Sequence, residues 1–495
     1  MERESFKSRM GFILVSAGCA IGLGNVWKFP YICGQYGGAA FILIYLIFLV
    51  ILGIPVLTCE FAVGRASRRS VAGAFEKLEP RKTRWHGLKA IGIIGCYMLM
   101  MFYTMVGGWM LYYCLRSVRG DFDGADPQMI SDAFSGMLAD APTMILWTVI
   151  ICVIGFAVCF FGLKSGIERI SKLMMIALLV IMVVLAIHSI TMPGSGEGIK
   201  FYLVPDIDKI IENGIGNVVF AALSQAFFTL SLGVGAMLIF GSYLDKDQKL
   251  IGEAVSVTSL DTFVALTAGL IVIPACFSFG IQPDSGPNLI FVTLPNIFAG
   301  IAGGRIWGGL FFLFMSFAAL TTIIAVFENL LAFNKDLFGW SRGKSVAIVA
   351  PLMVILSMPC VLGFNLLSDI QPLGQGSTIM DLEDFIVSNN LLPLGSLGYI
   401  LFCTRSNGWG WDNFTDEANT GRGLGISRSL KGYVSYGIPA IIMVIYLKGY
   451  YDKFAPMGNV TLICWMIVAI LLLTYVLYCS GTVSYTHLTL PTIRL

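Results

Sequence analysis

The segment GCAIGLGNVWKFP, residues 18–30, decides how this chain folds. It lies within an apolar stretch long enough to span a bilayer, yet it holds three glycines within seven residues, then an asparagine, a lysine and a proline. Glycine lowers the preference for helix, and backbone groups that leave a helix inside a membrane need partners around a cavity or ligand. The segment therefore predicts a broken membrane helix that binds something small and polar.

The composition places most of the chain in a membrane. Of its 495 residues, 57% are hydrophobic and 13% are charged, about half the roughly 25% that is usual for soluble proteins. The net charge of +2 gives no reason to expect nucleic acid, and the 12 cysteines lack metal-ligand spacing. The chain has no HExxH or GxSxG motif, so we expect neither an enzyme nor an organic cofactor.

Apolar windows of about 20 residues predict twelve membrane-spanning helices. With an intracellular amino terminus, 24 of the 32 lysines and arginines fall on the inner side, as the positive-inside rule requires. We therefore expect a multi-pass protein of the cell membrane with a cytoplasmic amino terminus. Its short ends and outer loops favour a prokaryotic inner membrane. The predicted spans are 10–35, 39–63, 89–115, 143–162, 168–191, 215–240, 252–280, 306–334, 344–365, 379–403, 431–450 and 458–479.

A second interrupted span repeats the anomaly of the first. The segment QAFFTLSLGVG, residues 225–235, places hydroxyls and two glycines in the middle of the sixth span. Because spans 1 and 6 each open a block of five, the pattern predicts an inverted repeat with a binding site near the membrane midplane. We expect two repeat halves, 1–191 and 192–403, followed by the last two helices in 404–479. The tail, 480–495, resembles a non-native segment, so no function is inferred from it.

These motifs resemble those of the neurotransmitter:sodium symporter family. The resemblance implies an all-α polytopic membrane protein with a leucine-transporter-like fold, a five-plus-five inverted repeat with broken helices 1 and 6. It also implies sodium-coupled uptake of an amino acid by alternating access. The matching segments, in the expected order of spans, are GCAIGLGNVWKFPY (18–31), GGAAF (37–41), QAFFTLSLGVG (225–235), FAALTT (317–322) and DLEDF (381–385).

The resemblance implies a substrate site between helices 1, 3, 6 and 8. Gly22 leaves room for a substrate carboxylate where monoamine carriers of the family have an aspartate, and Tyr103 matches the tyrosine that donates to that carboxylate. The implied pocket has no charged side chain, and Val234 and Val326 are smaller than the residues they match, so we expect a neutral, large apolar or aromatic amino acid. The implied contacts are Cys19, Ala20, Gly22, Gly24, Leu99, Tyr103, Phe228, Thr229, Ser231, Val234, Thr322, Ile323 and Val326.

Two sodium sites carry over by the same resemblance. Both use hard oxygen ligands, and the first shares the substrate carboxylate, which couples the ion to the substrate. The first site comprises Ala20, Asn25, Thr229 and Asp261, and the second comprises Gly18, Ile21 and Ala318 through their carbonyls with the hydroxyls of Thr321 and Thr322.

Asp261 departs from the asparagine that the family usually has. An ionisable residue at membrane depth is costly and usually functional. We expect it to supply the negative charge that a bound chloride provides in chloride-dependent relatives, so transport is expected to need no chloride. The alternative is a protonated carboxyl held by hydrogen bonds in packing.

The resemblance also implies an outer and an inner gate. Lys28 and Asp384 match the outer pair, where lysine replaces the forked arginine and predicts a weaker, water-bridged latch. Arg3 and Asp336 match the inner pair, with Tyr243 beside them. Glu328 replaces a glutamine of the family near Tyr243, so the role of that position stays open. Glu60 matches a position that braces the broken helices. A transport-inactive amino-acid sensor of the same fold remains an alternative, and the oligomeric state, monomer or homodimer, stays open.

Overall fold

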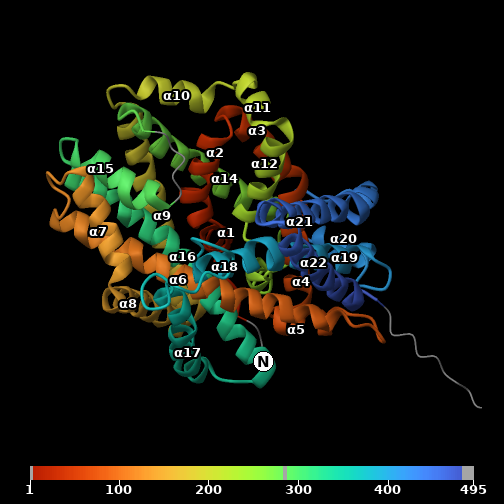
Figure 1. Ribbon diagram of the computed structural model, residues 1–495. Coiled ribbons are helices and arrows are strands. Elements are labelled where there is room, and N and C mark those ends of the chain that lie inside the picture. The colour runs from red at the N-terminus through yellow and green to blue at the C-terminus, as the bar shows by residue number, and fades with distance from the viewer. Residues whose placement is uncertain (1–3, 282–286, 482–495) are drawn as a thin grey trace, which may run out of the picture.

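The computed structural model describes residues 4–281 and 287–481 as a bundle of helices (Figure 1). Within these residues the extended pairing is limited to one isolated bridge, Gln248 with Arg422. The first part of the chain forms α1 (Arg9–Ala20), α2 (Phe29–Gln35), α3 (Ala39–Phe48), α4 (Ile54–Ser67), α5 (Val71–Leu78), α6 (Lys89–Arg119), α7 (Pro127–Ala139), α8 (Ala141–Phe160) and α9 (Glu168–Ile190). The middle of the chain forms α10 (Ser195–Leu203), α11 (Ile207–Asn213), α12 (Ile215–Thr229), α13 (Ala236–Gly241), α14 (Leu250–Ser278), α15 (Leu294–Ala299) and α16 (Gly304–Phe338). The last third forms α17 (Arg342–Leu362), α18 (Ile379–Ile386), α19 (Leu392–Thr404), α20 (Trp411–Ala418), α21 (Ile438–Phe454) and α22 (Asn459–Cys479).

The membrane spans agree with the predicted set. Ten helical segments of the described chain are long and apolar enough to cross a bilayer. The pair formed by α1 and the helix Gly24–Gln35 bends by 59° and adds an eleventh span. The remaining predicted span, the sixth (215–240), is occupied by α12 and α13, which are separated by non-helical residues 230–235. Both predicted breaks are therefore present, in the first and the sixth spans.

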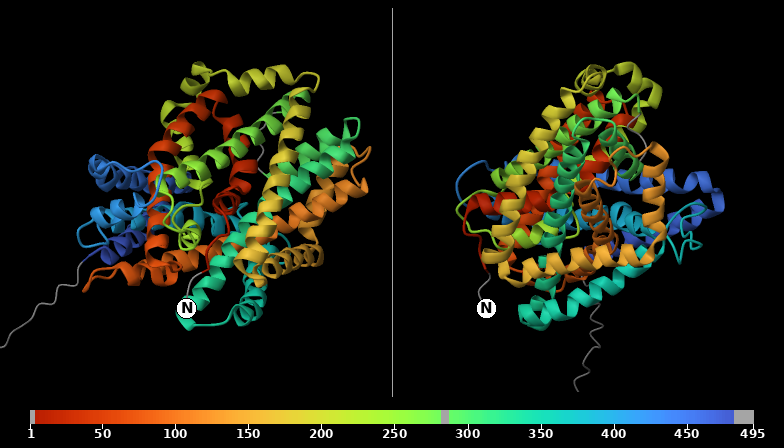
Figure 2. Two further views of the ribbon diagram at one scale, coloured as in Figure 1. Left: turned by 180° about the vertical axis from the view of Figure 1, so that it is seen from behind. Right: turned by 90° about the vertical axis from the view of Figure 1, so that its left-hand side faces the viewer.

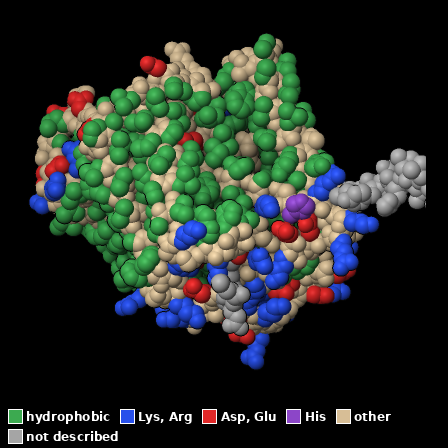
Figure 3. Space-filling model, turned by 90° about the horizontal axis from the view of Figure 1, so that it is seen from below, with side chains coloured by type: hydrophobic (Ala, Val, Ile, Leu, Met, Phe, Trp, Pro, Cys, Tyr) green, Lys and Arg blue, Asp and Glu red, His purple; other side chains and the backbone are tan. Residues whose placement is uncertain are grey.

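Segments predicted to lie on opposite sides of the membrane occupy opposite ends of the bundle. Figures 1 and 2 show α10 and α11 across one end, while α5 and the beginning of α17 lie at the other end. Between α14 and α16, a π-helical turn, Leu289–Thr293, leads directly into α15. Seen from below, lysines and arginines gather toward one side and hydrophobic side chains cover a broad neighbouring face (Figure 3).

Two helices mark the centre and the periphery of the bundle. In the most apolar window of α16, 83% of the residues are buried, whereas the corresponding share in α22 is 11%. An apolar helix with so little protein contact needs lipid around it, because hydrocarbon replaces the missing protein neighbours. The central helix α16 therefore provides the frame of the site, and α22 faces the bilayer.

The inner part of the broken sixth helix rests directly on α4. A Cβ atom on Gly64 would lie 2.0 Å from the carbonyl oxygen of Leu238, and one on Gly241 would lie 2.6 Å from the carbonyl oxygen of Phe61. Only glycine permits such backbone contact between two helices. Residues 236–241 are therefore packed on α4, so the inner half of the sixth span has a support that does not depend on the outer half, α12.

We expect Gly64→Ala to destabilise the protein, because the new methyl group forces α4 and α13 apart. Overpacking of this kind costs about 1–3 kcal/mol. The measurement is the melting temperature of the purified protein in detergent. The matched control is Gly136→Ala on α7, where a Cβ meets nothing within 4 Å and alanine favours the helix by about 1 kcal/mol. Equal melting temperatures for Gly64→Ala and the wild type would contradict the backbone contact.

Candidate functional site

A cavity of about 370 Å³ lies where the breaks in the first and sixth spans face α6 and α16. Nine of the thirteen predicted substrate contacts line it: Ala20, Gly22, Gly24, Leu99, Tyr103, Phe228, Thr229, Ser231 and Thr322. The other four, Cys19, Val234, Ile323 and Val326, are buried without lining it. Val234 instead packs toward α6, where its Cγ1 lies 2.5 Å from the place that a Cβ on Gly95 would take.

Sequence reasoning missed much of the outer wall of this cavity. Most of these residues are apolar or aromatic, and two of them, Phe102 and Val106, follow Leu99 by about one and two turns of α6. Their helical spacing from Leu99 was a usable signal, and Asp381 lies in the matched DLEDF segment, whereas Met380 and Leu392 lie outside the matched segments. The missed lining residues are Leu23, Trp27, Tyr31, Phe102, Val106, Pro287, Met380, Asp381 and Leu392.

The break in the first span is held open by Tyr103. Its hydroxyl accepts a hydrogen bond from the backbone N–H of Leu23 at 3.0 Å. A Cβ on Gly22 would lie 2.2 Å from that hydroxyl oxygen and 3.1 Å from Oγ1 of Thr322. The absence of a side chain at Gly22 therefore keeps backbone groups of the first span exposed to the cavity.

The break in the sixth span requires unusual backbone conformations. Ser231, which lines the cavity, has a φ of +51°, and Gly233 has a φ of +101°. A Cβ on Gly233 would lie 2.1 Å from the carbonyl oxygen of Leu392. The N–H of Gly233 donates to Oε1 of Glu60 at 2.5 Å, so this buried carboxylate from α4 replaces a lost helical acceptor.

Four backbone carbonyls converge on the hydroxyl of Thr322. Its Oγ1 lies 3.2–3.4 Å from the carbonyl oxygens of Gly18, Cys19, Ile21 and Ala318. One hydroxyl proton can satisfy a single acceptor, so this cluster has more lone pairs than donors. Hard oxygens in excess are what a hard cation binds. Thr321, also assigned to this predicted second sodium site, directs its hydroxyl to the carbonyls of Phe317 and Ala318 at 3.0 Å.

The side chains of the predicted first sodium site are also in contact. Nδ2 of Asn25 donates to Oδ1 of Asp261 at 2.8 Å and to Oγ1 of Thr229 at 3.0 Å. Oγ1 of Thr229 donates in turn to Oδ2 of Asp261 at 3.0 Å. Asp261 is fully buried, and this triad joins the first span, the sixth span and α14. Ala20 lines the adjoining cavity.

The outer gate residues lie at the upper part of the same cavity. Nζ of Lys28 is 3.9 Å from the ring centroid of Phe228, and Oδ1 of Asp384 accepts from Oγ of Ser388 at 2.6 Å. No direct ion pair joins Lys28 to Asp384, both of which the structure describes. A cation over an aromatic face is attracted by the ring quadrupole, so Lys28 covers the aromatic wall of the cavity.

On the inner side, Arg3 lies outside the described residues. The carboxylate of its predicted partner, Asp336, accepts from the N–H and from the hydroxyl of Ser70, each at 2.6 Å. The ring of Phe6 packs edge-on against Tyr243, with centroids 6.0 Å apart.

Glu328 has a partner that sequence reasoning missed. Arg342, in the first turn of α17, donates through both terminal nitrogens to Glu328 at 2.6 and 2.9 Å. The hydroxyl of Tyr243 donates to the same carboxylate at 2.7 Å. Arg342 also lies 3.6 Å from Glu4, so one network joins α16, α17, the segment after α13 and the amino-terminal segment.

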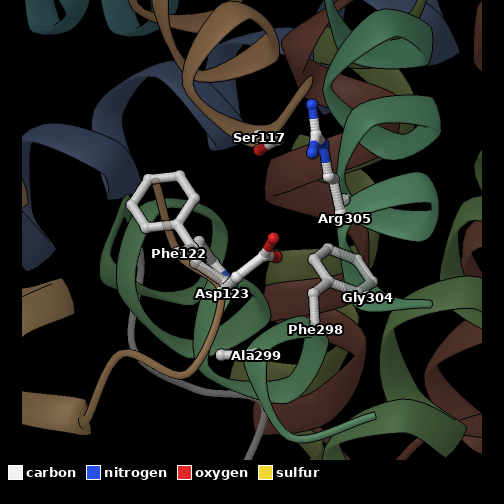
Figure 4. Close-up of a pocket in the computed structure, with 9 residues that line it drawn as sticks. Ser117, Phe122, Asp123, Phe298, Ala299, Gly304 and Arg305 are labelled. Atoms are coloured by element: carbon white, nitrogen blue, oxygen red, sulfur yellow. The ribbon is translucent and has the colours of Figure 1, made fainter. Parts of the chain in front are cut away.

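A second hollow lies near the carboxyl end of α6, between Asp123, Phe298 and Arg305 (Figure 4). Its volume is about 10 Å³. A single water molecule needs roughly 10–15 Å³ measured in this way. This hollow is too small for an organic solute, and the central cavity is the candidate site.

Comparison with known proteins agrees with this geometry. A model of the sodium:neurotransmitter symporter family matches residues 3–126 and 133–388. The chain is 35% identical over 402 residues to the uncharacterized sodium-dependent transporter YhdH of Bacillus subtilis, covering 80% of this chain and 86% of that protein. It is 26% identical over 405 residues to the sodium-dependent serotonin transporter of Drosophila melanogaster, covering 73% and 64% of the two chains.

Among solved structures, the crystal structure of MhsT in complex with L-phenylalanine has a TM-score of 0.81 and 36% sequence identity. The likeness covers 90% of this chain and 100% of that one. The residues matched by the family model include both broken spans. The chain therefore belongs to the sodium:neurotransmitter symporter family, and it is a multi-pass, sodium-coupled membrane transporter with a leucine-transporter-like fold.

Proposed function

We propose that this transporter takes up a neutral, large apolar or aromatic L-amino acid together with sodium. The observation that carries the proposal is the floor of the cavity, where the open backbone at Gly22 faces the hydroxyl of Tyr103. These groups suit a substrate that brings its own carboxylate, and the lower wall holds no charged side chain. The charged lining residues, Lys28, Asp381 and Asp384, lie at the outer end.

The rest of the wall favours a large side chain. Leu99, Phe102 and Phe228 give it an apolar and aromatic surface, and 370 Å³ is ample space for a phenylalanine-sized solute. MhsT, whose structure contains L-phenylalanine, shares 36% of its sequence with this chain. Burial of an aromatic ring against such a wall is a main source of affinity.

The oxygen clusters support two sodium sites. The carbonyls around Thr322 form the second site, and Asn25, Thr229 and Asp261 with the substrate carboxylate form the first. A tenfold gradient is worth about 1.4 kcal/mol per ion, and one charge moving through about 100 mV adds roughly 2.3 kcal/mol. Two ions then supply on the order of 7 kcal/mol, enough for about 10⁵-fold accumulation.

Asp261 makes chloride unnecessary under this proposal. Two sodium ions and a zwitterion bring two positive charges into a buried site, and a fixed carboxylate offsets one of them. The setting is a prokaryotic inner membrane with a cytoplasmic amino terminus, and the gates at Lys28–Asp384 and Arg3–Asp336 alternate in opening. The similarity to YhdH of Bacillus subtilis, a bacterial protein, supports a prokaryotic source.

The first prediction is the substrate class. Proteoliposomes with sodium outside are expected to accumulate labelled L-phenylalanine or a similar neutral amino acid, and those with potassium outside are not. Aspartate, lysine and phenethylamine, which lacks the carboxylate, are expected to compete at least about tenfold more weakly, since each leaves a charge or a polar group unpaired. Sodium-dependent binding without uptake of any amino acid would favour the sensor instead.

The second prediction concerns the oxygen cluster. Thr322→Val keeps the shape of the side chain and removes the hydroxyl, so the sodium concentration for half-maximal uptake is expected to rise about tenfold. The control is Thr267→Val on α14, whose hydroxyl donates to the carbonyl of Phe263 in its own helix at 2.7 Å. An unchanged sodium dependence in Thr322→Val would remove this cluster from the proposal.

The third prediction concerns chloride. Replacing chloride by gluconate is expected to leave the initial rate of uptake by the wild type unchanged. Asp261→Asn is expected to lower that rate about tenfold or more at fixed sodium, because a charge-assisted partner of the first ion is lost. A wild type that requires chloride would show that Asp261 does not supply the compensating charge.

A further inference from the structure

The break in the sixth span leaves backbone carbonyls below the cavity that need donors from other helices. Two of them belong to adjacent residues, Val234 and Gly235, just before α13 begins. The carbonyl of Gly235 accepts from Nδ2 of Asn329 on α16 at 3.1 Å. The carbonyl of Val234 accepts from the thiol of Cys96 on α6 at 3.4 Å. The Gly235 carbonyl has only a long 3.4 Å bond, from the N–H of Ile239, within its own helix.

These two donors are connected to each other. Nδ2 of Asn329 also donates to Sγ of Cys96, at 3.3 Å. Both hydrogens of the amide are therefore used, one on the break and one on the thiol. Asn329 and Cys96 have no exposed surface, so water does not compete for these bonds.

The side-chain amide of Asn329 carries a cost in folding free energy at this buried position. Its Oδ1 is buried and has no hydrogen-bond partner among the described residues. An unsatisfied buried acceptor costs about 1–3 kcal/mol, and an apolar residue would avoid that cost in this apolar helix. The amide nitrogen, by contrast, has a full set of acceptors on the break and on α6. Packing alone does not explain an asparagine here, whereas its two donated bonds do.

We propose that Asn329 and Cys96 are positioning residues that fasten the lower end of the break to the two long helices α16 and α6. We call the bonds among Asn329, Cys96, Val234 and Gly235 the lower clasp. The clasp sets the position of the break that carries Ser231 to the cavity. It also closes the path below the cavity, because α13 cannot leave α16 without breaking it. This second consequence rests on the proposed alternating access, and the first does not.

Hydrogen–deuterium exchange of the purified transporter in sodium buffer tests the clasp without any substrate. Asn329→Ala is expected to speed exchange of the amides in residues 231–241 about tenfold, since the loss of one buried bond lowers the local opening energy. The control is Ser316→Ala on the same helix, whose buried hydroxyl donates to Phe312 in its own helix at 2.7 Å. Wild-type exchange in Asn329→Ala, or equal acceleration in the control, would overturn the clasp.

A pair of variants at Cys96 separates the bond from the volume. Cys96→Ser keeps a donor toward Val234 and an acceptor for Asn329, so exchange close to wild type is expected. Cys96→Ala removes both, and several-fold faster exchange is expected. These two variants decide the question even where Asn329→Ala does not fold, and equal exchange in both would overturn the clasp.

Uptake measurements distinguish this inference from the proposed substrate class. With labelled L-phenylalanine, Asn329→Ala and Cys96→Ala are expected to raise the concentration for half-maximal uptake about tenfold, while Cys96→Ser restores it. If the wild type takes up none of the amino acids tested but the exchange differences persist, the clasp stands and the substrate class fails. If uptake is normal in Asn329→Ala and exchange is unchanged, the clasp fails and the substrate class stands.

Discussion

The need of every backbone polar group for a partner inside the membrane is the constraint on which this structure depends. A continuous helix is the simplest way to meet this need, and two spans depart from it. At each interruption, side chains from neighbouring helices supply the missing hydrogen bonds. Tyr103 accepts from the N–H of Leu23, and Glu60 accepts from the N–H of Gly233. The backbone carbonyls that remain, above all those around Thr322, form the oxygen cluster of the proposed second sodium site, and Thr322 itself lines the cavity.

The continuous helices make these answers possible. The most buried of them, α16, contributes Thr322 to the cavity, Asn329 to the lower clasp and Glu328 to the inner network. Glu328 and Asn329 are adjacent and follow Thr322 by six and seven positions, about two turns, so one helix contacts the cavity at one level and both the lower clasp and the inner network at the next. A rigid element that carries several such contacts positions them more precisely than loops would.

The glycines and hydroxyls of residues 18–30 and 225–235 predicted the two breaks, because such residues in an apolar run have few structural uses. The resemblance to a family then placed nine residues on the cavity wall. Contacts between distant segments had no such signal: nothing in the sequence pairs Arg342 with Glu328 or Asn329 with Gly235, and only the fold brings them together. Val234 shows the opposite case, since its position in a matched motif predicted the cavity wall while its side chain packs toward Gly95.

The backbone contact of α4 with α13 gives access to a buried event from the outside. Gly64 and Gly241 leave no side chain between the two helices. A displacement of residues 236–241 therefore moves α4 directly, because no flexible side chain lies between them to absorb it. The carboxyl end of α4 is followed by Arg68, whose side chain is about one third exposed, and then by α5. A spectroscopic label at position 68 would report the motion of the sixth span from outside the cavity.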